Sequence, residues 1–264
     1  MYELILMAQF KNLLIFLFGL RLFIDLALQL MNFRHLKQNA GHVPPIFSES
    51  IDREKLRLMD SYNAVKIRFG IFQWIISNLL VIIFLFTAVF PAYTSWIERV
   101  PLPHYLQGFL FFLIIQGVVW FLELPMDYYF HFGIEARFGF NQYTRTGWLV
   151  DCLKNFLVSS VVTGVVVILI LLFLGTSFHF DWLKVVYGWG AATALILVFN
   201  YFIPVVLIPL FYRLRPVSDD ALRGNIEALV AQSGFTVKRL LVADESRKSN
   251  HVNAIFSGAG KTKT

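Results

Sequence analysis

The chain has 264 residues, of which 57% are hydrophobic and only 15% are charged, whereas soluble domains carry about 25% charged residues. A mean hydropathy of +0.64 excludes an ordinary soluble protein, and the lone Cys152 excludes an internal disulfide and a cysteine zinc cluster. The net charge of +6 is concentrated between apolar stretches. The composition therefore predicts an integral membrane protein with a small water-soluble part.

Five apolar stretches are each long enough to cross a bilayer, which takes about 20 helical residues. They are residues 12–31, 71–93, 106–129, 153–175 and 182–211. No basic residue precedes Lys11 and no small-residue cleavage site follows, so we expect the first stretch to be retained as an anchor. Pro204 and Pro209 predict a kink near the end of the last stretch. We expect a mainly α fold: a transmembrane helical bundle of about five spans, with a small, incomplete α+β cytoplasmic segment.

Polar side chains inside these stretches have two interpretations. Arg21 and Asp25 are four residues apart, so they share a helix face and can form an ion pair. The other members of this group are Asn78, Gln116, Glu123 and Asn200. They either pack helices together or line a wet internal surface that handles substrate, and the sequence leaves both open.

The connection at residues 32–70 follows the first span. Pro44 and Pro45 break it, and Ser50, Asp52 and Glu54 predict a helix that continues into the second span. Basic residues gather here, after the third span and in the tail, which places the N-terminus outside and the tail in the cytoplasm by the positive-inside bias. The same basic surface can hold anionic headgroups. We expect an inner-membrane protein if the source is bacterial and an endoplasmic reticulum protein if it is eukaryotic.

A glycine-containing segment, residues 132–144, follows the third span. Its glycines predict tight turns, and Glu135 and Arg137 can form an interfacial ion pair. We assign this loop a structural role.

The tail begins at Arg213. Ser218, Asp219 and Asp220 predict the start of a helix that Gly234 ends, and residues 239–243 predict a strand. A polar turn at residues 245–250 and an edge strand at 251–256 follow, and such an edge can hold an extended peptide by strand addition. About 50 residues cannot bury a useful core alone, so the tail is interpreted as the beginning of a domain.

Several of these segments resemble type 1 CAAX prenyl proteases, which are multi-span zinc metalloproteases. The matching segments are residues 32–36, 62–70, the pattern Glu-x-x-Phe-Gly-Phe-Asn-x-x-Thr at 135–144, and residues 246–263. The resemblance implies a transmembrane N-terminal domain at 1–212, with a cytoplasmic helical loop at 32–70, and the start of a metallopeptidase domain at 213–264. It also implies a substrate-side role for His251, Asn253 and Ala254; an ordinary hairpin is the alternative.

The zinc-binding motif of such a protease is missing. It needs two histidines at i and i+4 on a helix, with an intervening glutamate as general base. None of the six histidines begins H-E-x-x-H, and in the family that motif follows the segment ending at Lys261. We therefore expect a front portion without catalytic residues, which binds no zinc and is inactive alone. The whole enzyme would use zinc to cleave near the C-terminus of prenylated proteins.

Rival functions are weaker. A non-catalytic membrane protein that binds lipidated peptides or scaffolds a partner is the main alternative, and a transporter lacks any sign of inverted repeats. Residues 257–262 resemble part of a phosphate-binding loop, but Ile255 stands where glycine is required. Ser249, His251 and Asp244 are too close in one loop for a catalytic triad. We expect membrane lipid and an extended or prenylated peptide as partners, and no nucleic acid; the natural substrate, the need for prenylation and the oligomeric state stay open.

Overall fold

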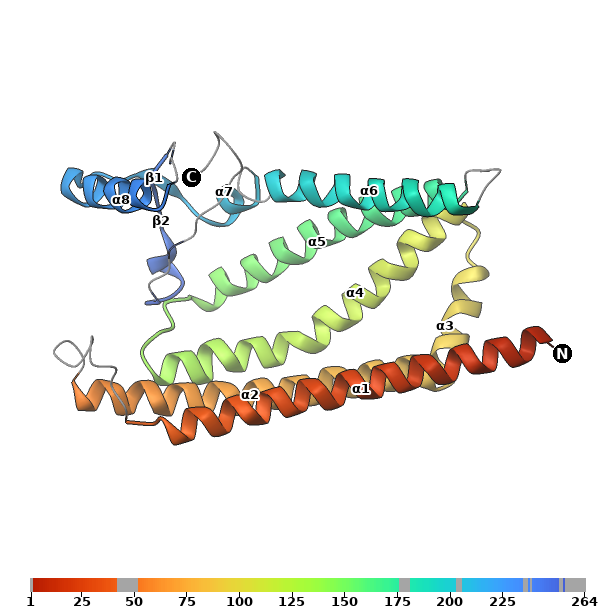
Figure 1. The fold of residues 1–264 in the computed structure, drawn as a ribbon, viewed down its shortest axis with the longest axis horizontal. Helices are drawn as coiled ribbons and strands as arrows, with labels where there is room; N and C mark the ends of the chain where they lie inside the picture. Colours follow the sequence, from red (N-terminus) through yellow and green to blue (C-terminus); the bar gives the residue numbers. More distant parts are fainter. Residues whose placement is uncertain are drawn as a thin grey trace. The chain divides into compact units, whose positions relative to one another are not determined.

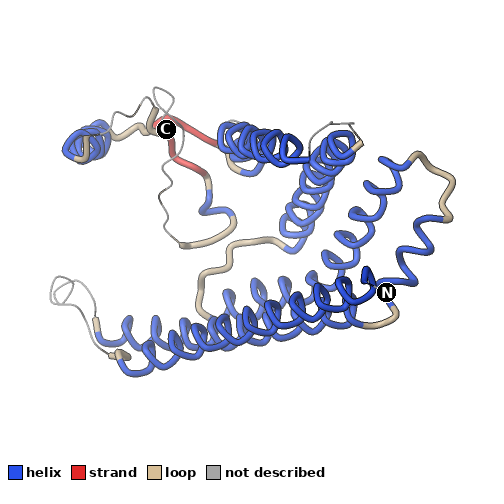
Figure 2. Tube along the Cα trace, turned by 45° about the vertical axis from the view of Figure 1, so that its right-hand side comes forward, coloured by secondary structure: helices blue, strands red, loops and turns tan. Residues whose placement is uncertain are grey.

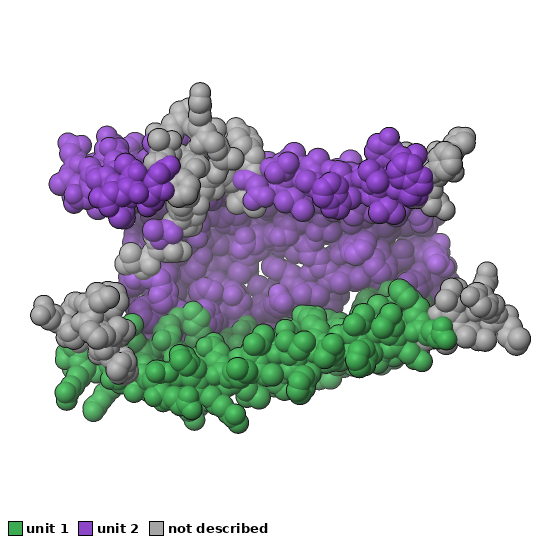
Figure 3. Space-filling view, in the orientation of Figure 1, with its two compact units in different colours: residues 1–92 green, residues 93–264 purple. Residues whose placement is uncertain are grey.

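The computed structural model describes residues 2–41, 52–175, 181–202, 206–234, 237, 239–251 and 254. This part of the chain is mostly helical (Figure 1). The helices are α1 Tyr2–Gln38, α2 Arg53–Phe86, α3 Val89–Glu98, α4 His104–Tyr129, η2 Phe130–Glu135, α5 Arg145–Leu174, α6 Asp181–Phe202, α7 Ile208–Phe211, α8 Asp220–Gln232 and η4 Glu245–Arg247. The strands are β1 Leu214–Pro216 and β2 Leu241–Ala243. The chain forms two compact units, residues 1–92 and 93–264 (Figure 3).

Five of the described helices are long and apolar enough to cross a membrane: α1, α2, α4, α5 and α6. This confirms the predicted fold class. The last predicted span was residues 182–211, and within it the structure describes α6 to Phe202 and the short helix α7, with Pro209 in its first turn. Pro204, where the kink was expected, lies outside the described residues.

The first unit is an antiparallel pair of helices, α1 and α2, which lie side by side in Figures 1 and 2. The rings of Phe18 and Phe86 are 5.9 Å apart. The predicted helix running from the connection into the second span is confirmed, since α2 is continuous from Arg53. It ends at Phe86, short of the predicted residue 93. Thr87 explains the break, because its hydroxyl donates to the Ile83 carbonyl and accepts from the Val89 amide.

The second unit is built on α4 and α5, which also pack antiparallel. The Gln116 side-chain amide donates to the Ser160 hydroxyl at 3.1 Å, and the ring of Trp120 contacts that of Phe156. Nearer the start of α4, Gly164 of α5 faces the Phe109 ring. Small residues at such a contact let two membrane helices approach closely.

The described tail contains α8, the short helix η4 and a two-stranded antiparallel sheet. Asp219 caps α8 by accepting from the amides of Ala221 and Leu222, and Gly234 follows the helix with φ +73°, as predicted. β2 forms at the predicted place, but its described partner is β1, with Arg215 opposite Val242.

The edge strand predicted at residues 251–256 is wrong at the two positions that can be checked. His251 and Ala254 lie in no strand, and the other four positions lie outside the described residues. His251 makes side-chain contacts, described below, instead of pairing as part of a strand.

Candidate functional site

The loop between α4 and α5 makes a tight turn that brings Phe140 and Asn141 back to Glu135 at the end of η2. α4 continues into η2, a π-helical turn of the kind that recurs at functional sites. The amides of Phe140 and Asn141 both donate to the Glu135 carbonyl, at 2.9 and 3.3 Å. Gly139, immediately before Phe140, has φ +76°, a left-handed conformation that glycine adopts without strain. Thr144 then caps α5 by accepting from the Gly147 amide. The predicted tight turn is confirmed at Gly139, whereas Gly133 lies inside η2, and residues 136–144 form the interhelical loop.

Residues 245–251 of the tail, the docking segment, pack against this interhelical loop. The Gln142 amide donates to the Lys248 carbonyl at 3.0 Å, and the Asn250 amide donates to the Phe140 carbonyl at 2.9 Å. The Asn250 side chain donates to the Gly139 carbonyl at 2.8 Å. Backbone pairing therefore joins two segments that lie more than a hundred residues apart in sequence.

A buried carboxylate anchors one end of the docking segment. The Glu135 side chain is only 6% exposed, and its Oε2 lies 2.9 Å from Nε2 of His251. The imidazole also stacks on the Phe140 ring, with centroids 4.2 Å apart and planes at 21°. The expected partner of Glu135 was Arg137, whose guanidinium instead lies over the Phe138 ring at 5.8 Å. His251 thus supplies a polar partner that a buried carboxylate needs.

Lys248 anchors the middle of the docking segment. Its Nζ lies 2.7 Å from Oδ2 of Asp151 on α5, and the two side chains are 17% and 15% exposed. The ammonium group also lies over three rings, those of Tyr212 at 4.4 Å, Phe211 at 5.6 Å and Tyr143 at 5.9 Å. A cation held by a carboxylate and by ring faces is bound from several directions.

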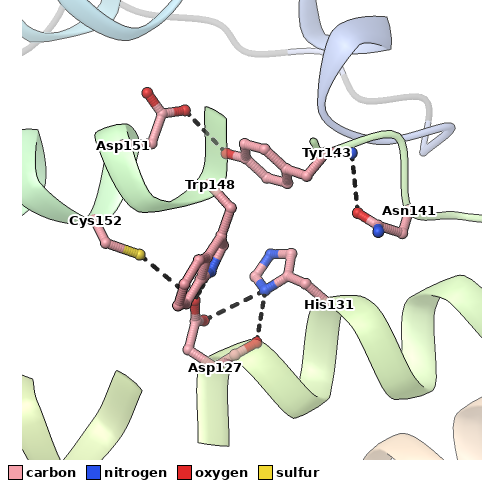
Figure 4. Close-up of polar contacts among 7 residues, drawn as sticks. All are labelled: Asp127, His131, Asn141, Tyr143, Trp148, Asp151 and Cys152. Atoms are coloured by element: carbon pink, nitrogen blue, oxygen red, sulfur yellow. Dashed lines mark hydrogen bonds and ion pairs between the residues drawn. The ribbon is translucent and has the colours of Figure 1, made fainter. Parts of the chain in front are cut away.

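The Tyr143 hydroxyl belongs to the same cluster. It donates to the Asp151 carboxylate at 3.1 Å (Figure 4). Burial and the neighbouring Asp151 charge raise the pKa of Tyr143 well above its usual value. Burial, with Glu245 and Asp151 nearby, also raises the pKa of Tyr212. Both phenols therefore remain neutral at physiological pH.

Asp127 on α4 organises a second polar cluster (Figure 4). Its Oδ2 accepts from the Trp148 indole at 2.6 Å and lies 3.9 Å from the Cys152 sulfur. Nδ1 of His131 lies 3.5 Å from the other carboxylate oxygen and 3.0 Å from the Asp127 carbonyl. The indole N–H occupies the position facing the carboxylate, which makes this cluster a hydrogen-bonding contact between α4 and α5.

The donor set does not fit a zinc centre. Within the part of the chain that the structure describes, no three His, Cys, Asp or Glu side chains are grouped as metal ligands. A catalytic zinc needs three such ligands around an open position.

The predicted substrate-side residues have three different outcomes. His251 contacts Glu135 and Phe140, Ala254 is exposed, and Asn253 lies outside the described residues. The sequence analysis missed Lys248 and Asp151 as a pair. A lysine in a polar turn and an aspartate near a helix start are common, so nothing in the sequence distinguishes these two. Only the three-dimensional structure shows that they form a pair.

The polar side chains within the spans mostly bond to nearby groups. Arg21 and Asp25 form the predicted ion pair at 3.3 Å. Asn78 donates to the Trp74 carbonyl, and Asn200 donates to the Ile196 carbonyl. Gln116 bridges α4 to α5, as described above, which favours the packing interpretation for that residue.

These features define a class: a multi-pass helical membrane protein whose docking segment packs on the loop between two of its spans. The family model for the CAAX prenyl protease N-terminal region, with five membrane helices, matches residues 32–213, which is more than half of the chain. The chain belongs to this family.

Individual relatives agree with the family assignment. CAAX prenyl protease 1 of Saccharomyces cerevisiae is 27% identical over 236 residues, covering 85% of this chain and 51% of that protein. The probable CAAX prenyl protease 1 of Schizosaccharomyces pombe is 37% identical over 141 residues, covering 52% of this chain and 28% of that protein. The crystal structure of S. mikatae Ste24p matches with a TM-score of 0.72 at 26% identity, over 90% of this chain and 58% of that one. This chain spans about half or less of these two curated relatives.

Proposed function

We propose that these 264 residues form the membrane domain and the substrate-side part of a zinc metalloendopeptidase that cleaves near the C-terminus of prenylated proteins. The observation that carries the proposal is the docking of residues 245–251 onto the interhelical loop, in a chain of the CAAX prenyl protease family. In this proposal His251, Asn253 and Ala254 border the peptide, and Glu135 and Phe140 hold the His251 ring. The sequence has no H-E-x-x-H, so the zinc ligands come from residues other than these.

Peptide binding and zinc binding by the purified 264-residue chain test the proposal together. A farnesylated, fluorescently labelled C-terminal peptide should bind the chain in lipid nanodiscs, as measured by anisotropy. The chain should hold less than stoichiometric zinc by mass spectrometry and should leave the peptide intact. His251→Ala should weaken peptide binding by about tenfold, the change that about 1.4 kcal/mol produces.

The matched control is His104→Ala, which removes an exposed histidine at the start of α4. This variant should bind peptide as the parent chain does. Peptide cleavage by these 264 residues alone, if a chelator abolishes it, would contradict the proposal that the zinc ligands come from other residues. One tightly held zinc per chain would contradict it as well. Equal peptide affinity in the His251 variant and the parent chain would contradict the substrate-side role.

A non-catalytic role in binding lipidated peptides is the second candidate, and the lack of H-E-x-x-H among these residues favours it. The two candidate functions predict different coding sequences after codon 264. An in-frame H-E-x-x-H within a few tens of codons after codon 264 supports the protease, and a stop codon supports the binding protein.

A further inference from the structure

A cluster of basic residues lies where α1 ends and α2 begins, and neither function proposed above uses it. Residues 32–70 hold seven Lys or Arg against four Asp or Glu. The seven are Arg34, Lys37, Arg53, Lys55, Arg57, Lys66 and Arg68, all exposed. One of the acidic residues, Asp60, is engaged by the Gly41 amide, which donates to its carboxylate at 2.8 Å. The described residues form no ion pair with the seven basic side chains.

Two of these cations, one from each helix, meet at a single aromatic ring. Nζ of Lys37 lies 5.0 Å from the centroid of the Phe33 ring, and Cζ of Arg68 lies 5.6 Å from the same centroid. Arg34 is one turn from Lys37 on α1, which places a third cation nearby. Like charges held close together repel, so an anion placed among them would be stabilised.

The cluster lies at the position along α1 and α2 where a lipid headgroup would be expected. The apolar stretch of α1 ends at Met31, just before Phe33, and that of α2 begins at Ile71, just after Arg68. Because the helices are antiparallel, both apolar stretches extend away from the cluster on the same side. Exposed apolar side chains border it, including Met31 at 63% and Phe72 at 51%. Basic and aromatic residues at the end of an apolar helix are typical of the membrane interface.

We propose that Phe33, Lys37 and Arg68, with Arg34 beside them, bind the headgroup of an anionic glycerophospholipid. The phosphate lies among the three cations, and the acyl chains follow the exposed apolar surface of α1 and α2. That adjacent apolar surface favours a lipid over an acidic protein, which would gain nothing from it. The proposal is independent of the peptidase function, since it involves neither the docking segment nor the interhelical loop.

Native mass spectrometry of the chain with added lipids tests the site. The parent chain should retain phosphatidylglycerol in preference to phosphatidylcholine. The double variant K37Q/R68Q should lose about 30-fold in phosphatidylglycerol affinity, because each Lys or Arg at an anionic surface contributes about fivefold to binding. The double variant K37R/R68K keeps both charges and should retain the preference, which separates loss of charge from loss of folding.

The matched control is R99Q/K184Q, which removes the same charge from Arg99, just after α3, and Lys184, in the first turn of α6. Because successive spans alternate in direction, the predicted orientation places both on the side of the membrane opposite residues 32–70. This control should change the affinity by less than about threefold. An equal loss of phosphatidylglycerol affinity in K37Q/R68Q and R99Q/K184Q would overturn the proposal, because the lipid would then be held by overall charge and not at one site. Displacement of the lipid by millimolar inorganic phosphate would also overturn it, since the site would then take a free anion.

Discussion

At the scale of single residues, Lys248 is the side chain that holds the docking segment to the membrane domain. It is mostly buried, it pairs with Asp151, and three aromatic rings surround its ammonium group. Removing one member of a buried ion pair leaves the other charge without its partner. Among the described residues, Asp151 would keep the Tyr143 hydroxyl and Lys154, whose Nζ is 3.9 Å away.

Lys248→Met should therefore lower the free energy of unfolding by about 2–4 kcal/mol. Thermal unfolding in detergent measures the change, and limited proteolysis should cut the tail sooner. Arg247→Met is the control, since Arg247 pairs with Asp244 at 3.9 Å with 61% of its side chain exposed. Exposed pairs contribute little, so that change should stay below about 0.5 kcal/mol. Equal effects of the two variants would contradict the anchoring role.

Tyr143 makes the stability of the docked segment depend on alkaline pH. Its pKa is raised by burial first and by Asp151 second. Because the pKa is higher in the folded chain than in the unfolded chain, folding favours the neutral phenol. The stabilisation is complete below about pH 10, the pKa of an unfolded tyrosine, and is lost as pH rises towards the folded value.

The melting temperature of the parent chain should accordingly fall more steeply between pH 9.5 and 11.5 than that of Tyr143→Phe. Tyr105→Phe, which removes a phenol from a side chain that is 44% exposed, should follow the parent curve. Parallel curves for the parent and Tyr143→Phe would show that this phenol does not carry the effect.

At the scale of elements, the contact between α4 and α5 depends on glycines. A Cβ at Gly164 would lie 2.7 Å from Cε2 of Phe109, and one at Gly108 would meet the Leu171 side chain. In lipid there is no hydrophobic drive between helices, so close packing and polar contacts such as Gln116 to Ser160 hold them together.

Gly164→Leu should lower the free energy of unfolding by about 1–3 kcal/mol, because overpacking forces the two helices apart. Unfolding in a mixed detergent titration measures it. Gly190→Leu on α6 is the matched control, since nothing lies within 4 Å of a Cβ there. A loss as large in the control would mean that lost glycine flexibility, and not the contact, is responsible.

At the scale of the whole molecule, orientation in the membrane is the prediction with the widest consequence. The proposed activity on prenylated cytosolic proteins requires the docking segment to lie on the cytoplasmic side, as the positive-inside bias predicts. In a Cys152→Ser background, R247C should react with an impermeant maleimide only from the cytoplasmic side, and K184C only from the opposite side. The reverse pattern would contradict both the orientation and the proposed substrate.

The sequence by itself determined the features that depend on local pattern: five apolar spans, the long α2 helix, the Arg21–Asp25 pair and the Asp219 cap. Each depends on residues within a few turns of one another, so periodicity and spacing are sufficient. The boundary at residue 212 and the substrate-side role of Asn253 stay predictions. Only the tertiary structure decided that His251 pairs with Glu135, that Lys248 pairs with Asp151, and that β2 pairs with β1. Such partners depend on which segments meet in space and on the requirement that buried charges be paired. Neither of these conditions produces a periodic pattern in the sequence.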